Sequence, residues 1–490
     1  MNPRKHSLLL LAALAAIITP LYSSPDIAPP SQCSSPGFTD AGLFGFSPQA
    51  KGADNTKALQ SAVDRGGTIT VSKPGIYQVA GTVYVGSNTS LILGAGVFLK
   101  KVADKGPFSH VLLNKGARTK TYDEHISIEG LQIIVNGVDA RTFKDAYGLH
   151  GQLAFFYVKD LRISGFRCLD LGHAQYGIQI CTFEDITVED AIIKGEKDGV
   201  HLGRGKRFTI RRCEFQTGDD AVALNAHDYA VGNPELGWIE DGIVENCHDL
   251  PDPTQRTGYF CRILAGAWID WKSGMQVQQS DTVVSNGRLY RVQANADGRV
   301  YTSTTQPTHE NGSMELDGIK WGVVQNDVTH TCGVRNVTFR DIFLENPRTS
   351  FSVHFDTGKY SRSYYPGAEI PKQEGIVLDD VRVLHTERTE FLHIATPIDS
   401  ITVMNSSLRN SPVHFVTVSD FTTPGKTLLN FVGCTFLQAG RFEFLKNDAP
   451  NKSIVLQTSA SSVIPEDFSA SISPGTAVMK VTSDLPGLTK

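Results

Sequence analysis

The sequence has no basic excess, no long apolar run beyond its first residues and no closely spaced pair of cysteines. Lys and Arg number 46 against 51 Asp and Glu, a formal charge of −5, which argues against nucleic acid as a partner. No later segment is apolar for long enough to cross a membrane, so we expect no membrane span. Because no C-x-x-C pair or His/Cys cluster has metal-ligand spacing, we expect no structural zinc, no other metal and no cofactor.

The first 24 residues have the features of a secretion signal. Basic residues precede an apolar run, Leu8 to Ile18, and small residues follow it. The run is too short to span a bilayer comfortably. No cysteine follows the small residues in lipoprotein fashion, because Cys33 comes later, after Ser-Gln. We therefore predict a signal peptide over residues 1–24 and a secreted or periplasmic protein.

Eight cysteines remain after this segment. Cys247 and Cys261 bracket a polar loop and are the best candidates for a disulfide in an oxidising compartment. In the alternative interpretation cysteines are small core residues, and Cys168, Cys213 and Cys434 lie inside strand-like patterns that favour this.

A repeat between Phe183 and Asn225 organises the chain. With a shift of 22 residues Val200 falls on Val222, Leu202 on Leu224, and Asp198 on Asp220. Such a period, with short alternating apolar runs in each copy, is typical of a solenoid whose coils stack and share one core. The alternation predicts strands, and the charged and glycine-containing stretches between them predict turns.

The N-terminal part supports the same architecture. Residues 54–63 predict one short amphipathic helix with Asp54 or Asn55 as its cap, and strands follow at once. This helix, followed by G-G-T-x-x-V and P-G-x-Y, resembles the opening of the pectate-lyase-like superfamily of right-handed β-helices. We therefore expect an all-β fold: a right-handed parallel β-helix (solenoid) of roughly ten coils with an N-terminal capping helix and one small inserted β module. The Ser-rich tail after Lys446 predicts a loose last strand or a terminal cap.

The inserted module covers residues 268–324, so that 25–267 and 325–490 form the β-helix domain. The segment holds three of the four tryptophans, and dense turn signals separate its short strands. Its W-x-x-G…V…Y…PTH…G…W pattern is similar to that of carbohydrate-binding and phage-tail accessory modules, which implies a role in sugar binding. In the alternative interpretation the aromatic residues only build the core of a very small domain.

The repeat brings carboxylates together. Stacked strands lie about 4.8 Å apart, so Asp198 and Asp220 are expected one above the other, with Asp219 beside them. Three such charges repel one another, and at least one carboxyl should have a raised pKa. Cleavage of a glycosidic bond with inversion needs one protonated carboxyl and one carboxylate that activates a water, so this cluster points to that chemistry.

The motifs K-D-G (197–199) and G-D-D (218–220) resemble the N-T-D and G-D-D motifs of the polygalacturonase-like glycosidases, glycoside hydrolase family 28. The resemblance implies that Asp219 is the general acid and that Asp198 and Asp220 hold and deprotonate the water. It also implies a polysaccharide or oligosaccharide substrate, a galacturonan in the first instance.

The chain departs from the family pattern around the aspartates. Lys197 precedes Asp198, the family's G-H-G has only His227 as a nearby candidate, and R-I-K is echoed by Arg262-Ile263-Leu264. We predict Lys197, His227 and Arg262 as substrate-binding residues. A neutral or sulfated galactose-type glycan is therefore as good a candidate as galacturonan. Lys197 and three further basic residues could meet anions or form a solvated turn: Arg204, Lys206 and Arg207.

A further candidate binding region is Phe351–Gly367. His354 and Asp356 end a predicted strand, and a loop with cations and tyrosines follows. Aromatic and cationic side chains on a loop beside a groove are typical of sugar binding, so His354 is predicted to bind substrate. A surface loop packed by its own tyrosines is the alternative.

Three classes of function are compatible with the sequence. The carboxylate triad favours a secreted inverting glycoside hydrolase. A polysaccharide lyase on the same fold would use calcium-binding carboxylates with Lys197 or Arg262 as base, and an ultraviolet-absorbing product would identify it. A non-catalytic glycan-binding or tailspike-like protein would leave oligosaccharides unchanged. The sequence does not indicate an oligomeric state.

Overall fold

The computed structural model of the chain describes residues 37–251, 258–294, 297–345, 347–356, 361–384, 390–396, 398–409, 414–419, 425–438, 440–449, 452–464, 467–473 and 478–488. Residues 37–490 form one compact unit. The predicted signal peptide and Cys33 lie outside the described residues. No helix within these ranges combines the length and the apolar character needed to cross a membrane.

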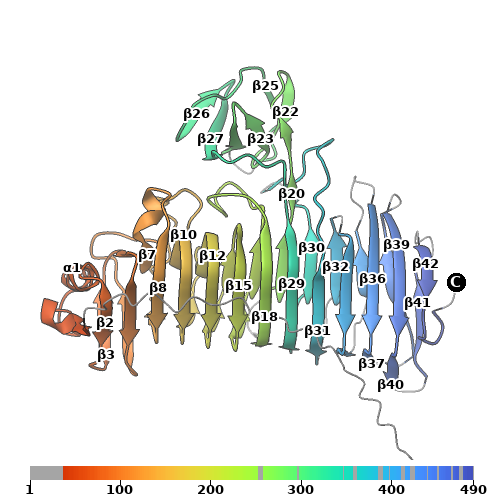
Figure 1. Cartoon of the computed structure of the whole chain (residues 1–490), viewed down its shortest axis with the longest axis horizontal. Helices are drawn as coiled ribbons and strands as arrows, with labels where there is room; N and C mark the ends of the chain where they lie inside the picture. Colours follow the sequence, from red (N-terminus) through yellow and green to blue (C-terminus); the bar gives the residue numbers. More distant parts are fainter. Residues whose placement is uncertain are drawn as a thin grey trace, which may run out of the picture. The chain divides into compact units, whose positions relative to one another are not determined.

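Parallel strands arranged in three ladders form a right-handed β-helix, which confirms the predicted fold class. One 33-stranded sheet contains all three ladders, and in Figure 1 the strands follow one another in sequence order from β2 to β42. Some long strands bend and contribute to two ladders. The three ladders thus form the walls that enclose one continuous core.

The first ladder consists of β1 (Thr39–Asp40), β2 (Gly67–Val71), β5 (Thr89–Leu93), β8 (Asp123–Glu129), β10 (Gly151–Ser164), β12 (Tyr176–Glu189), β15 (Gly205–Arg211), β18 (Ile239–Asp249), β29 (Val334–Leu344), β31 (Ile376–Val383), β33 (Ser400–Met404), β36 (Gly425–Val432), β39 (Lys452–Ser459) and β42 (Val478–Thr482). The second ladder adds β3 (Gly75–Val79), β6 (Val97–Lys101), β9 (Gln132–Ile134), β11 (Arg167–Leu171), β13 (Ile192–Gly195), β16 (Glu214–Thr217), β34 (Ser407–Arg409), β37 (Thr435–Leu437) and β40 (Ser462–Ile464). The third ladder adds β4 (Val83–Val85), β7 (Leu112–Asn114), β14 (Val200–Leu202), β17 (Val222–Asn225), β19 (Cys261–Leu264), β30 (Phe351–His354), β32 (Leu392–Ala395), β35 (His414–Val418), β38 (Arg441–Asn447) and β41 (Ser469–Ile472).

The predicted shift of 22 residues is confirmed in the central coils, where Val200 pairs with Val222. Other coils are longer because loops leave the solenoid, and Val244 pairs with Phe339 across a separation of 95 positions. The prediction of about ten coils was too low. The tail expected to be loose forms β39 to β42, in which Ile454 and Leu456 are fully buried. The many Ser and Thr residues that face outward there hide this alternation in the sequence.

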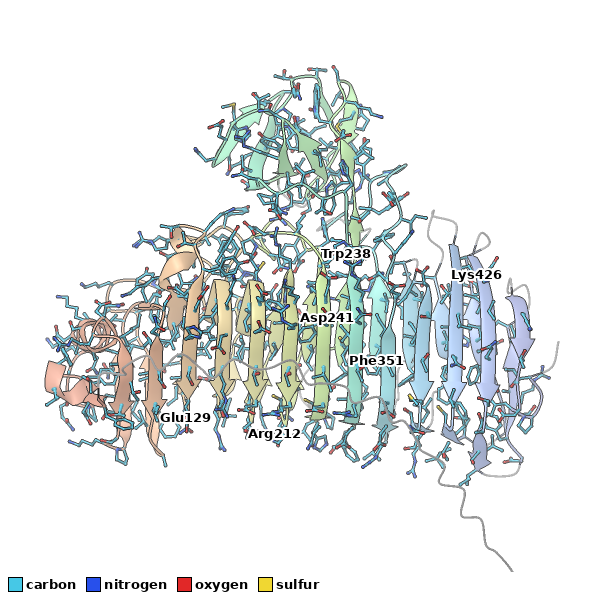
Figure 2. All side chains as sticks on the ribbon, in the orientation of Figure 1. Glu129, Arg212, Trp238, Asp241, Phe351 and Lys426 are labelled. Atoms are coloured by element: carbon cyan, nitrogen blue, oxygen red, sulfur yellow. The ribbon has the colours of Figure 1, made fainter. Side chains whose placement is uncertain are left out.

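A column of left-handed residues bends the strands of the first ladder. Each member has a φ between 49° and 58°, a conformation that Asn and Asp adopt more readily than most residues. Asp241 is the member on β18 (Figure 2). The pairings of their neighbours place the following residues in one column: Asn88, His125, Asp160, Asp185, Arg207, Asp241 and Asn336. The column lies inside the first ladder, because Lys159 and Leu161, on either side of Asp160, both pair with β8.

The capping helix α1 covers Gly52–Val63, so it begins two residues earlier than predicted and ends at the predicted residue. Its N-cap is Lys51, which makes no side-chain cap, so Asp54 and Asn55 are not the cap. Asn55 instead lies in the first turn, and its side chain exchanges two hydrogen bonds with the Ser47 backbone, each 2.9 Å. The predicted apolar stripe of α1 is buried over the first coil, as a solenoid cap requires. Two 3₁₀ turns lie near this end, η1 (Ala41–Phe44) and η2 (Lys115–Arg118).

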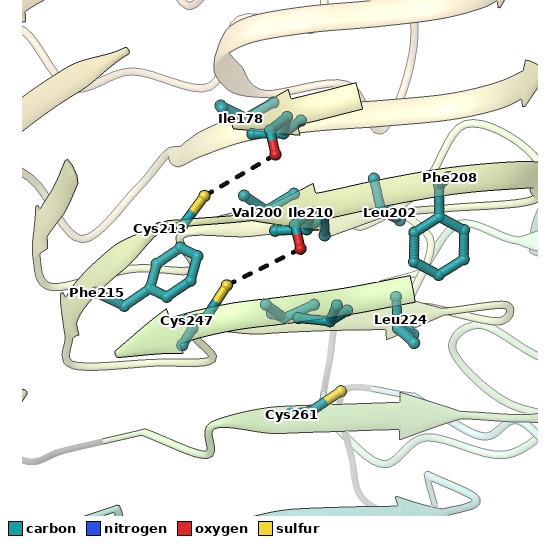
Figure 3. Packing of buried hydrophobic residues seen from close by; sticks show 14 of the residues in the cluster. Ile178, Val200, Leu202, Phe208, Ile210, Cys213, Phe215, Leu224, Cys247 and Cys261 are labelled. Atoms are coloured by element: carbon teal, nitrogen blue, oxygen red, sulfur yellow. Dashed lines mark hydrogen bonds between the residues drawn. The ribbon is translucent and has the colours of Figure 1, made fainter. Parts of the chain in front are cut away.

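The predicted disulfide between Cys247 and Cys261 is wrong, because both cysteines are free and buried. They lie on different ladders, Cys247 on β18 and Cys261 on β19, and each packs into the core (Figure 3). The Cys247 thiol donates to the carbonyl of Ile210 at 3.9 Å. The interpretation as small core residues is confirmed for Cys168, Cys213 and Cys434.

A separate group of strands leaves the solenoid after β19 (Figure 1). Its five-stranded sheet consists of β21 (Ile269–Asp270), β23 (Thr282–Ser285), β24 (Arg288–Val292), β27 (Ile319–Gln325) and β26 (Ser313–Leu316). Two smaller sheets pair β20 (Gly266–Ala267) with β28 (Thr331–Cys332), and β22 (Met275–Val277) with β25 (Tyr301–Ser303). Trp268, Tyr290 and Trp321 are buried, so these aromatic residues build cores as the alternative interpretation states.

Candidate active site

The register of the third ladder brings the predicted aspartates together. Strands β14 and β17 pair directly, and the Gly199 amide donates to the carbonyl of Asp220 at 2.9 Å. Asp198 and Asp220 each lie just before one of these strands and are therefore stacked neighbours, as the repeat predicts. Asp219 precedes Asp220 in the same turn.

One carboxylate oxygen from each of Asp198, Asp219 and Asp220 lies within 4.8 Å of the other two. Carboxyl oxygens this close can act on the same small group, such as one water molecule. Asp198 and Asp220 are buried, whereas the side chain of Asp219 is 32% exposed. Asp219 is thus the carboxyl that a bound substrate can reach.

Two cations offset part of the charge of the three carboxylates. The Lys197 ammonium contacts Asp219, and the Nε of Arg262 lies 2.7 Å from Oδ2 of Asp220. This second contact is an ion pair without hydrogen-bond alignment, and both oxygens of Asp220 have no hydrogen-bond partner among the described residues. Arg262 comes from the next coil, where it pairs with Ala223, which in turn pairs with His201.

His201 lies on β14, three residues after Asp198, and orients the Asp198 carboxylate. Its Nδ1 lies 2.8 Å from Oδ2 of Asp198, and its Nε2 lies 3.2 Å from Oδ1 of Asn233 and 3.4 Å from Oδ2 of Asp228. Both ring nitrogens therefore face side-chain oxygens. The ring is fully buried and stacks on Tyr176 at a centroid distance of 4.1 Å.

The surroundings push the pKa values of the stacked carboxyls apart. Burial raises the pKa of Asp220 well above its usual range, and the charges of Asp219 and Asp198 add to this although Arg262 opposes it. Burial acts in the same direction on Asp198, but the His201 hydrogen bond and nearby cations outweigh it and lower its pKa to about 2. Two carboxyls whose pKa values are separated by their environment are typical of acid–base sites.

The other predicted binding residues occupy different positions. His227 follows β17, at the opposite end from the aspartates, and is fully buried beside Trp268 with a ring-centroid distance of 6.1 Å. Burial lowers its pKa to about 3, with Arg291 adding to the effect. His354 ends β30, where its Nδ1 lies 2.9 Å from the Ser352 hydroxyl and its side chain is 15% exposed. His354 thus lies on the same ladder as Arg262, one coil further on.

Among the described contacts, the remaining basic residues of the predicted cluster do not reach Asp198, Asp219 or Asp220. Arg204, Lys206 and Arg207 have carboxylate partners of their own. Lys206 and Arg207 are exposed, as a solvated turn predicts, whereas the Arg204 side chain is mostly buried. In the loop after His354, Lys359 and Tyr360 lie outside the described residues. Tyr364 stacks on Phe355, which fits the interpretation as a self-packed loop.

Sequence reasoning missed His201 and Tyr259. The His201 side chain points away from the solenoid core, whereas those of Val200 and Leu202 point into it, and all three are buried. A polar residue at such a position beside Asp198 was the available signal. Tyr259 lies one coil beyond Asp220, because the Ala221 amide donates to its carbonyl at 2.9 Å. The Arg348 guanidinium lies 5.0 Å from the centroid of the Tyr259 ring. No signal in the sequence placed Tyr259 there, since the shift from β17 to β19 departs from 22 residues.

The sequence matches no protein-family model and no curated protein. Solved structures are similar in fold. A family 28 exopolygalacturonase from Yersinia enterocolitica is 10% identical, with a TM-score of 0.45 over 93% of this chain and 79% of that one. An endo-xylogalacturonan hydrolase from Aspergillus tubingensis is 12% identical, with a TM-score of 0.43 over 90% and 98%. PfbA, a surface adhesin of Streptococcus pneumoniae, is 12% identical, with a TM-score of 0.49 over 90% and 93%.

Proposed function

We propose that the protein is a glycoside hydrolase that cleaves a polysaccharide with inversion, using Asp198, Asp219 and Asp220. The observation that carries this proposal is the group of three carboxyls, one oxygen of each within 4.8 Å of the others, in which Asp219 is exposed and Asp198 and Asp220 are buried. Asp219 donates the proton to the leaving oxygen, because it is the member that substrate can reach. Asp198, kept ionised by His201, and Asp220 hold the attacking water, and Asp198 accepts its proton.

The contact between Lys197 and Asp219 bears on the substrate class. Asp219 has to be protonated before it can act as an acid, so it has to part from Lys197. A uronate carboxylate or a sulfate ester on the substrate would attract the Lys197 ammonium and release Asp219. We therefore propose an anionic galactose-type glycan, galacturonan or a sulfated galactan, with Arg262 and His354 on the adjoining coils as further contacts.

A panel of purified polysaccharides tests this function. Polygalacturonate, a sulfated galactan and a neutral galactan are incubated with the wild type and with Asp219→Asn, and new reducing ends are measured. We expect reducing ends from at least one anionic polymer with the wild type and a loss of at least about 100-fold in the variant. Oligosaccharides that stay unchanged throughout would favour a non-catalytic glycan-binding protein instead.

A polysaccharide lyase is the second candidate, because the spacing of the three carboxylates would also suit a cation. The charges at the site oppose it. A lyase needs a neutral base, yet Asp198 and Asp219 outweigh burial and raise the pKa of Lys197, and Asp220 does the same for Arg262. Lys197 and Arg262 also supply positive charge where calcium would bind.

Secretion through residues 1–24 and the division into a β-helix domain (25–267 and 325–490) and an insert (268–324) stay predictions. A sugar-binding role of the insert would rest on Trp271, which is half-buried and donates from Nε1 to the Ser303 hydroxyl at 2.8 Å.

A further inference from the structure

The loop between β17 and β18 is tied to the candidate active site. Asp228 and Asn233 on this loop are fully buried, and both side chains reach Nε2 of His201. Asn225 holds the loop from β17: its Nδ2 donates to Oδ2 of Asp228 at 2.9 Å, and its carbonyl accepts from Nδ2 of Asn233 at 2.7 Å. The position of the His201 ring, and with it the hydrogen bond to Asp198, depends on this loop.

The insert holds this loop from the other side. Arg291 on β24 is 2% exposed, and its guanidinium donates to the carbonyls of Asp228 (3.2 Å), Ala230 (3.3 Å) and Asn233 (2.7 Å). Hydrogen bonds from a charged donor are stronger than neutral ones, and an unpaired buried carbonyl is costly. One side chain therefore fixes three points of the loop.

Two further contacts connect the same parts. The Ala230 amide donates to the Ser280 hydroxyl at 2.8 Å, and the Leu236 amide donates to Oε1 of Gln325 at 2.9 Å. Ser280 precedes β23, and Gln325 ends β27. The loop is thus held at Ala230 in its interior and at Leu236 near its end. Its interior leaves little room, because a Cβ on Gly232 would lie 2.3 Å from the carboxyl carbon of Asp228.

We propose that Arg291 is a positioning residue for the reaction, which acts through Asn233 and Asp228 on His201 and through His201 on Asp198. The insert then completes the catalytic wall. This inference rests on the proposed role of Asp198. Arg291 is buried and contacts only backbone carbonyls of the loop among the hydrogen bonds described. Its replacement should therefore change turnover through the geometry of the site and not through substrate binding.

The test compares Arg291→Met with Arg291→Lys and Arg288→Met. Arg288 lies on the same strand, but its guanidinium bonds within the insert, to Asn286 and Glu310, so its replacement is the matched control. Kinetics use the anionic polysaccharide that the wild type cleaves. Hydrogen exchange of residues 226–238, measured by mass spectrometry without substrate, reports the loop itself.

For Arg291→Met we expect kcat to fall at least about tenfold with KM changed less than about threefold, because a small displacement of a catalytic group is costly. Amides of residues 226–238 should exchange faster, Arg291→Lys should recover part of both effects, and Arg288→Met should behave as wild type. An unchanged loop in Arg291→Met, or equal effects of both methionine variants, would overturn the inference.

If Arg291→Met does not fold, Ser280→Ala gives the answer. It removes the acceptor of the Ala230 amide, so exchange at the centre of the loop should accelerate and kcat should fall more than KM changes; exchange and kcat at wild-type values would overturn the inference. If the wild type cleaves no polysaccharide, the proposed function fails. The exchange measurement still decides whether Arg291 holds the loop.

Discussion

At the scale of residues, the site consists of three aspartate carboxyls, each of which has different neighbours. Asp198 faces the buried imidazole of His201, Asp220 has an imperfectly aligned guanidinium beside it, and Asp219 faces solvent beside Lys197. The sequence repeat predicts that these groups meet. The roles follow from their neighbours: His201 comes from the same coil as Asp198, and Arg262 comes from the coil after Asp220.

Replacing each aspartate by asparagine tests these roles. Asp219→Asn removes the proton donor and should lower kcat by on the order of 10²–10⁴. Asp198→Asn and Asp220→Asn should each disrupt the water site with losses of the same order. Circular dichroism should show an intact fold for all three, because asparagine nearly keeps the shape. Wild-type rates in all three variants would refute the assignment.

The pKa directions predict opposite effects of pH on stability. Asp198 has a depressed pKa of about 2 in the folded protein, so its contribution is present above about pH 4 and is lost as the pH falls towards 2. Asp198→Asn should therefore cost on the order of 2 kcal/mol of unfolding free energy at pH 7 and little at pH 2.

Asp220 has a raised pKa, so its favourable contribution is present at low pH and is lost as the pH rises. Asp220→Asn should therefore raise the melting temperature at pH 7 relative to the wild type, and the gain should vanish below about pH 4. Thermal unfolding across pH 2.5 to 8 measures both variants. A lower melting temperature of Asp220→Asn at pH 7 would contradict the raised pKa.

At the scale of elements, close packing between coils keeps the carboxyls in register. A Cβ on Gly199 would lie 2.6 Å from the carbonyl of Ala221 and 2.6 Å from the Phe215 ring. Gly199→Ala should thus separate β14 from β17, with a lower melting temperature and a loss of turnover. Gly81→Ala is the control, since its Cβ would meet only a methyl group of Thr56 at 3.5 Å. Equal melting temperatures of the two variants would contradict this account.

The free cysteines give a second prediction for the elements. Cys247 and Cys261 pack on different ladders in the core. Alkylation of the denatured, unreduced protein should modify both, and reductant should leave the melting temperature unchanged. A peptide pair joined through these two cysteines in mass spectrometry would show that the predicted disulfide forms after all.

The repeat was the strongest signal for the elements, and it predicted the pairing of Val200 with Val222 because coils without long loops keep a constant length. It could not predict where Tyr259 and Arg262 lie, since the shift from β17 to β19 departs from 22 residues. It also underestimated the C-terminal coils, because outward Ser and Thr residues hide the alternation. The loop contacts of Arg291 had no signal in the sequence, because they join segments 58 to 63 positions apart.

At the scale of the whole molecule, we expect the wall of the β-helix to act without a metal. Lys197 and Arg262 supply positive charge beside the carboxylates. Treatment with EDTA should therefore leave the rate of reducing-end formation unchanged, and added calcium should not raise it. Loss of activity with EDTA and recovery with calcium would favour the lyase.

The most direct test of the central claim is proton NMR of the first products from the anionic polysaccharide that is cleaved. We predict that the new reducing end appears with the anomeric configuration opposite to that of the broken bond and then mutarotates. The retained configuration would contradict the account, because it would require a covalent intermediate on one carboxylate. An olefinic proton in the product would contradict it too, since elimination, and not hydrolysis, would then have broken the bond.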